Sequence, residues 1–203
     1  MLCGLPRSPT ARWAAFTAST VRCPTCSRSA IDDRLDARSL LPGIRAQMVA
    51  LGFELKARVR VTVVDPDELA AETGHDQDGL LFGVTWHQPH AHGRDDAVLG
   101  IKVVRGLTAI HFGQTVAHEI GHAWLAQHSS AHRDLIVEEG VSELLAGAWL
   151  KKQRMPFADS LRENLLTNPD PVYGGGYRLT REAVRRHGIR VVLDHVCRTG
   201  ALP

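Results

Sequence analysis

The pentapeptide at residues 118–122, which reads HEIGH, constrains this chain more than any other part of its sequence. Residues four apart lie one above the other on one face of an α-helix, because the helix has about 3.6 residues per turn. Apolar residues recur at helical spacing through residues 112–127, which predicts a helix around the motif. We therefore expect one helix face to present the imidazoles of His118 and His122 to the same point.

Two histidines in this arrangement suit a zinc ion, which binds imidazole nitrogen at about 2.0–2.1 Å. Glu119 would stand beside the open coordination position and could take a proton from water, whose pKa zinc lowers towards ~7. An isolated HExxH pattern also occurs by chance, but here the histidine face carries Thr115 and Leu125 and no Lys or Arg. The motif thus predicts a zinc-dependent peptidase, a hydrolase with Glu119 as its general base.

Such a site needs a third protein ligand, and the next predicted helix, residues 135–150, carries three carboxylates. Its apolar spacing places Glu138 at the edge of the apolar stripe, and Glu139 and Glu143 on the far side. The helical pattern therefore does not choose among the three.

Composition fits one globular domain, with 44% hydrophobic and 23% charged residues in 203. No apolar run approaches the ~18 residues of a membrane span, so we expect a soluble protein with no membrane partner. A net charge of +2 argues against a nucleic-acid partner. The N-terminus lacks the apolar core of about 7–15 residues that a secretory signal needs, which favours a cytoplasmic location.

The remaining pattern predicts an α+β fold in which a small mixed sheet packs on the motif helix and on the second ligand-bearing helix. We expect a helix over residues 32–51, and strands over residues 55–64 and 98–104. Residues 74–96 should form turns around one or two short strands. The glycine-rich PVYGGGY should be a turn, followed by a helix from about Thr180. The strand at 98–104 could offer a free edge to an extended peptide.

Cysteines near the N-terminus indicate a possible second metal site. Cys23 and Cys26 have the spacing of a zinc knuckle, and Cys3 resembles part of another, although a fourth ligand is missing. The alternative is a leader whose cysteines bind nothing. We accordingly predict a truncated LIM-like or zinc-ribbon knuckle, or a leader, over residues 1–30 and the peptidase domain over residues 31–203.

The stretch GLTAIHFGQTVAHEIGHAWLAQ, followed by VEEGVSELLAGAWL, resembles the catalytic region of the DA-one peptidases, LIM-domain regulators of plant organ size. PVYGGGYR and HGIRVVLDHVCRTGALP are similar to the closing segment of that family, so the resemblance covers about residues 98–203. It implies a zincin-like fold and a gluzincin-type peptidase that acts on protein or peptide substrates. Glu139 would then be the third zinc ligand, and Glu143, one turn later, would orient a ligand histidine.

The resemblance also implies two candidates for stabilising the oxyanion, Tyr173 and His195, of which Tyr173 is favoured. Each also has a purely structural interpretation, as a packed aromatic residue or a hydrogen-bonded core histidine. The plant proteins carry ubiquitin-interacting motifs and a long LIM region upstream, so ubiquitin dependence cannot be carried over. A rival hypothesis is a non-catalytic, zinc-stabilised adaptor on a peptidase fold, in which Glu119 would be dispensable.

Overall fold

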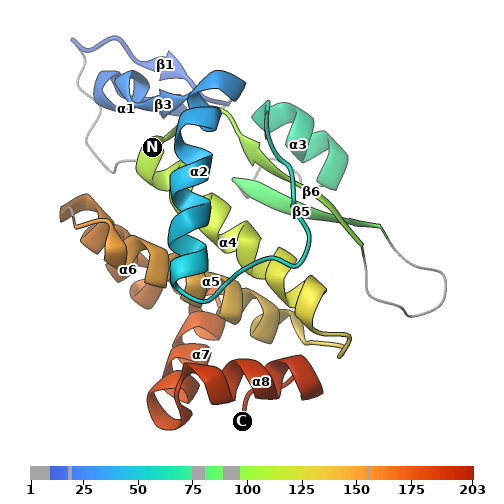
Figure 1. The fold of residues 1–203 in the computed structure, drawn as a ribbon. Helices are drawn as coiled ribbons and strands as arrows, with labels where there is room; N and C mark the ends of the chain where they lie inside the picture. Colours follow the sequence, from blue (N-terminus) through green and yellow to red (C-terminus); the bar gives the residue numbers. More distant parts are fainter. Residues whose placement is uncertain (1–9, 18–19, 75–80, 89–96, 155) are drawn as a thin grey trace.

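The computed structural model describes residues 10–17, 20–74, 81–88, 97–154 and 156–203, and these form an α+β fold with three small sheets (Figure 1). In chain order the elements are β1 (Ala14–Ala15), β2 (Val21–Arg22), α1 (Pro24–Arg28), β3 (Ala30–Ile31), α2 (Arg34–Ala50), β4 (Val61–Val64), α3 (Pro66–Thr73), β5 (Gly83–Gln88), β6 (Ala97–Val104), β7 (Leu107–Thr108), α4 (Ala109–His128), α5 (Leu135–Lys152), α6 (Pro156–Thr167), α7 (Tyr173–His187) and α8 (Ile189–Thr199).

The largest sheet is mixed, as expected, and has the strand order β4-β6-β5. β4 runs parallel to β6, whereas β5 runs antiparallel to it with an irregularity between Trp86 and His87. The strand predicted at residues 98–104 is therefore present as β6, but it lies in the centre of this sheet. The expectation that it offers a free edge is wrong, because both of its sides are already paired; β5 is the edge strand nearer the site described below.

The strand predicted over residues 55–64 forms only at its end, as β4. Before β4 the backbone makes other hydrogen bonds: the Ala57 N–H donates to Gln127 Oε1, and the Val59 carbonyl accepts from Arg45 Nη2. The Ile101 N–H donates to the Arg60 carbonyl and the Arg105 N–H to the Val64 carbonyl, so the even-numbered residues bond to β6, whereas the backbone groups of Ala57 and Val59 belong to the side that faces away from it. Regular pairing with β6 begins where Val61 meets Ile101.

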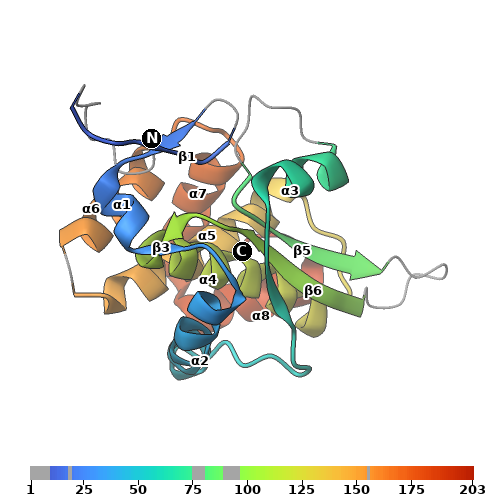
Figure 2. The ribbon, with the colours of Figure 1, turned by 90° about the horizontal axis from the view of Figure 1, so that it is seen from above.

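The helices expected at 112–127 and 135–150 are confirmed as α4 and α5, each a few residues longer than predicted. Gly106, with φ of 90°, turns the chain from β6 into β7 immediately before α4. α4 then packs against β5 and β6 as well as against α5, and seen from above it lies beneath the sheet (Figure 2). The motif helix is thus held on two sides by the core.

The glycine-rich segment is not a turn, because α7 begins at Tyr173 and includes all three glycines. A Cβ on Gly174 would lie 2.0 Å from the Asn168 carbonyl oxygen, and a Cβ on Gly176 would lie 2.4 Å from that of Ile136. The two glycines therefore permit a close approach of α7 that a side chain would prevent. Close packing of α7 on α5 offsets the helix-breaking tendency of glycine, which is about 1 kcal/mol per residue.

α2 confirms the helix expected at residues 32–51. The Asp33 side chain caps its first turn by accepting hydrogen bonds from the N–H groups of Leu35 and Asp36. Upstream, β3 pairs with β7, and Phe16 and Ile31 are buried in the same core as α4. In Figure 1 these N-terminal elements lie at the opposite end of the molecule from α7 and α8. The proposed boundary at residue 30 stays a prediction.

Within the described residues, every helix is too short or too polar to cross a membrane.

Candidate metal centre

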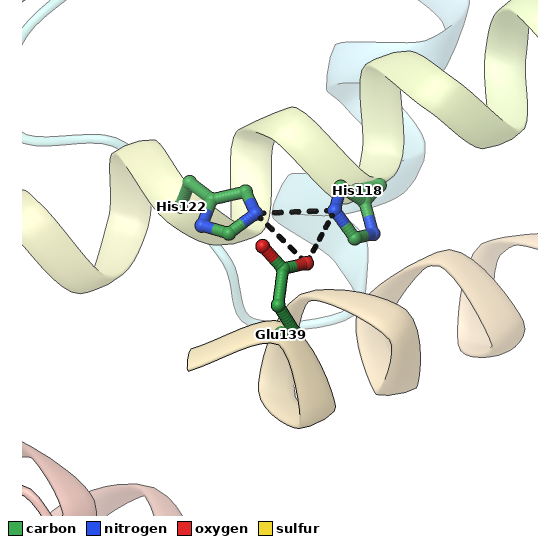
Figure 3. A group of neighbouring side chains, drawn as sticks. All are labelled: His118, His122 and Glu139. Atoms are coloured by element: carbon green, nitrogen blue, oxygen red, sulfur yellow. Dashed lines mark hydrogen bonds and ion pairs between the residues drawn. The ribbon is translucent and has the colours of Figure 1, made fainter. Parts of the chain in front are cut away.

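Three side chains from α4 and α5 converge on one point (Figure 3). His118 Nε2 and His122 Nε2 are 3.1 Å apart. Glu139 Oε2 lies 3.1 Å from His118 Nε2 and 3.5 Å from His122 Nε2. Such a group of potential ligand atoms, all within 4.8 Å of one another, could hold a metal ion.

Close packing on two sides of α5 explains why Glu139 takes part. A Cβ on Gly121 of α4 would lie 2.8 Å from Ser142 Cα, and one on Gly140 would lie 2.5 Å from the Gly176 carbonyl oxygen of α7. Glu139 is accordingly only 7% exposed. The helical pattern failed to select this residue because it assumes one buried face, whereas α4, α6 and α7 all contact α5.

The carboxylates that face the outer nitrogens of the two histidines favour a cation at the point of convergence. His122 Nδ1 lies 3.1 Å from Glu138 Oε1, and His118 Nδ1 lies 3.7 Å from Glu143 Oε1. An N–H directed from each Nδ1 to its carboxylate leaves both Nε2 lone pairs directed at Glu139 Oε2, a buried oxygen without a hydrogen-bond donor. Three converging acceptors repel one another unless a cation lies between them, and two imidazoles with one carboxylate suit zinc.

The pKa values indicate the same surplus of negative charge. Burial alone would lower the pKa of His122, but the hydrogen-bonded carboxylate of Glu138 and the nearby carboxylate of Glu139 outweigh it and raise the pKa to about 9. Burial likewise opposes a rise in the pKa of His118, yet Glu143 and Glu139 raise it well above its usual value. For Glu139, burial favours a higher pKa, but the two histidines lower it to about 2. The cluster therefore attracts positive charge, whether as protons or as a metal ion.

A cavity of about 940 Å³ opens onto these residues. Its wall includes Gly83, Val84 and Thr85 of β5, the cluster itself, and Leu161 and Leu165 of α6. Glu119, Glu138, Glu139 and Glu143 are its charged carboxylates, and no Lys or Arg is among its described lining residues. The cavity is large enough to receive a segment of an extended peptide beside the cluster.

The two candidates for oxyanion stabilisation lie in different places. Tyr173, at the start of α7, lines the cavity with its ring centroid 6.5 Å from that of His118. Burial, followed by the charge of Glu139, raises the pKa of Tyr173 to about 12, so its hydroxyl keeps its proton and can donate a hydrogen bond. His195 lies on α8 and does not line the cavity. The structure thus brings Tyr173, but not His195, to the candidate centre.

Two residues that contact the site were not selected from the sequence. Thr85 of β5 donates a hydrogen bond to Glu119, and Glu138 contacts His122 rather than the point of convergence. The sequence did point to Glu138, since it was one of the three candidate carboxylates. No sequence pattern pointed to Thr85, because it is 34 residues from Glu119 along the chain.

The predicted N-terminal zinc knuckle is described only in part. Cys23 and Cys26 are both buried, and the Cys26 N–H points to Cys23 Sγ at 3.3 Å. Cys3 lies outside the described residues. Within the ranges that the structure describes, only His118, His122 and Glu139 form a group of three or more potential metal ligands. A structural zinc at the cysteines stays a prediction.

His111 gives the protein a pH-dependent stability that can be measured separately from the cluster. Burial lowers its pKa, and its neighbours are the uncharged Thr108 hydroxyl, 2.7 Å from Nδ1, and the Phe157 ring. The unfolded chain binds a proton here below about pH 6.5 while the native state resists it, so this stability is present above pH 6.5 and is lost as the pH falls. From pH 7.5 to pH 5.5 we therefore expect the free energy of unfolding of wild type to decrease relative to that of a His111→Asn variant, by roughly a few tenths of a kcal/mol or more. The two cluster histidines, whose raised pKa values act in the opposite direction, are the same in both proteins.

Urea denaturation of both proteins at the two pH values measures this difference. An equal change in both proteins would show that His111 does not resist protonation.

Fold and site together define an α+β protein with a candidate metal centre of two histidines and one glutamate. The model of the DA1-like family, described as Protein DA1, matches residues 43–164, which is more than half of the chain. The protein therefore belongs to the DA1-like family, as the resemblance in its sequence predicted.

Known relatives agree with this assignment. Protein DA1 of Arabidopsis thaliana is 28% identical over 144 residues, which cover 57% of this chain and 27% of the relative. The LIM domain-containing protein HDR3 of Oryza sativa subsp. japonica is 24% identical over 152 residues, which cover 57% of this chain and 30% of the relative. The chain thus spans under a third of the length of these relatives. No solved structure matches it significantly.

Proposed function

We propose that this protein is a zinc-dependent peptidase of the gluzincin type, with a zincin-like fold. The observation that carries the proposal is the convergence of His118 Nε2, His122 Nε2 and Glu139 Oε2 beside a cavity that Glu119 also lines. Those three residues would hold the zinc ion. When bound, zinc lowers the pKa of water and polarises a carbonyl oxygen.

The chain's own residues would supply the proton transfers. Glu119 follows the first ligand histidine and lines the cavity, where its carboxylate can take a proton from the attacking water and pass it to the leaving amine. Tyr173 keeps its hydroxyl proton and can donate a hydrogen bond to the developing oxyanion. Glu138 and Glu143 face the outer nitrogens of the two histidines and would fix the orientation of both rings.

The substrate would be an extended protein or peptide segment paired with β5. The Phe82 carbonyl accepts a hydrogen bond from the Val104 N–H, so the backbone there faces β6. Hydrogen bonding alternates along an antiparallel strand, and therefore the backbone groups of Gly83 and Thr85 should face away from β6. Both residues line the cavity, so a peptide added at this edge would pass beside Glu119.

The Glu119→Gln variant tests the proposal. Glutamine keeps the shape of the side chain but cannot accept the proton, so we expect peptidase activity to fall by at least about 100-fold. The measurement is cleavage of a mixed library of fluorogenic peptides by zinc-loaded protein, with zinc content determined in parallel. Glu163→Gln is a matched control, since Glu163 is exposed on α6 and does not line the cavity.

We expect both variants to keep the zinc content of the wild type, and the control to keep its activity. Full activity in Glu119→Gln would refute the proposed role of this residue. Zinc-loaded wild-type protein that binds peptides without cleaving them would instead favour the adaptor hypothesis.

A further inference from the structure

We propose that Thr85 is a positioning residue that holds the Glu119 carboxylate in the orientation needed for proton transfer. The inference rests on the proposed function, because it concerns the same general base. It adds a residue from another part of the chain, on β5, that contacts the base directly.

The hydrogen bond between the two side chains is short and buried. Thr85 Oγ1 lies 2.7 Å from Glu119 Oε2 and 3.0 Å from the Glu119 carbonyl oxygen. A hydroxyl has a single proton, so Thr85 donates to one of these two oxygens. The carboxylate oxygen is the closer of the two and the stronger acceptor. Thr85 is 8% exposed and Glu119 is 4% exposed, so little water can replace this donor.

Gly83 confines the same carboxylate from its other side. A Cβ on Gly83 would lie 3.0 Å from Glu119 Oε1 and 2.7 Å from Thr115 Cγ2. β5 therefore lies directly on the motif helix at the level of Glu119, and glycine leaves the room that the carboxylate occupies. With Oε2 bonded to Thr85 and Oε1 against Gly83, the side chain has few other places to go.

Restricting Glu119 in advance should speed the reaction. A glutamate side chain has several rotatable bonds, and ordering them only when the reaction begins would add to the barrier. A base already held in place by a hydrogen bond avoids this cost. Loss of the Thr85 hydroxyl should therefore lower kcat and leave KM nearly unchanged, because Thr85 orients the base and makes no required side-chain contact with the substrate.

Two substitutions separate the hydroxyl from the packing of the side chain. Thr85→Val keeps the shape and removes the hydroxyl, whereas Thr85→Ser keeps the hydroxyl and removes a methyl group. With the library peptide that wild type cleaves fastest, we expect Thr85→Val to lower kcat by roughly 10- to 100-fold and Thr85→Ser to stay within about threefold of wild type. KM and zinc content should match the wild type in both variants. A valine variant as active as wild type, or serine and valine variants equally impaired, would overturn the proposal.

Crystal structures of wild type and Thr85→Val give a readout that does not depend on activity. We expect the Glu119 carboxylate to leave its position, or to occupy two positions, in the valine variant. An unchanged carboxylate would overturn the proposal even if the variant were slow. If wild type cleaved no peptide, the proposed function would fail, whereas this comparison would still decide whether Thr85 positions Glu119.

Discussion

Elemental mass spectrometry of the His122→Ala variant is expected to find no bound zinc, whereas wild type prepared with excess metal should carry about one ion per chain. The substitution leaves only His118 and Glu139 at the point of convergence. Zinc sites in proteins use three or four protein ligands, so two should not retain the ion through dialysis. The variant also removes the imidazole whose Nδ1 lies 3.1 Å from the half-buried Glu138 carboxylate.

The Cys23→Ser variant is the control for zinc bound elsewhere. If the N-terminal cysteines bind no metal, this variant should match wild type, and zinc should be lost with His122→Ala alone. Zinc lost in part from each variant would indicate that the predicted knuckle holds a second ion. Wild-type protein without zinc after metal-replete preparation would refute the metal centre.

Replacing Gly176 by Ala should destabilise the protein severely. Its new Cβ would lie 2.4 Å from the Ile136 carbonyl oxygen and 3.1 Å from the backbone of Gly140, and a backbone cannot move aside as a flexible side chain can. Overpacking of a core typically costs about 1–3 kcal/mol, and contact with backbone should place this variant at or above the upper end. The measurement is the free energy of unfolding from urea denaturation.

Gly175→Ala is a matched control in the same turn of α7. A Cβ there would meet only the Asp170 carbonyl oxygen at 3.7 Å, an ordinary contact. Alanine favours a helix over glycine by up to about 1 kcal/mol, so this variant should be neutral or slightly more stable. Equal destabilisation by the two substitutions would contradict the close packing of α5 and α7, which places Glu139 and Tyr173 at the cavity.

Elements with strong local patterns were predictable from the sequence. α2, α4 and α5 have apolar residues at helical spacing, and β6 is a mostly apolar strand followed closely by Gly106. The pairing of His118 with His122 was also predictable, because both residues lie on one helix and its geometry alone brings them together. Glu139 could be named only through the resemblance to a family, since the pattern of its own helix pointed elsewhere.

Contacts between distant segments decided the rest. The glycine-rich segment is helical because α5 lies against it. Strand pairing likewise left β5, and not β6, at an edge of the sheet, and tertiary packing brought Thr85 to Glu119. The sequence by itself determined the helices and the histidine pair, since both follow from interactions within about two turns of chain. Only the tertiary structure decided which carboxylate lies with the two histidines and which hydroxyl contacts Glu119, because burial and non-local hydrogen bonds select those residues.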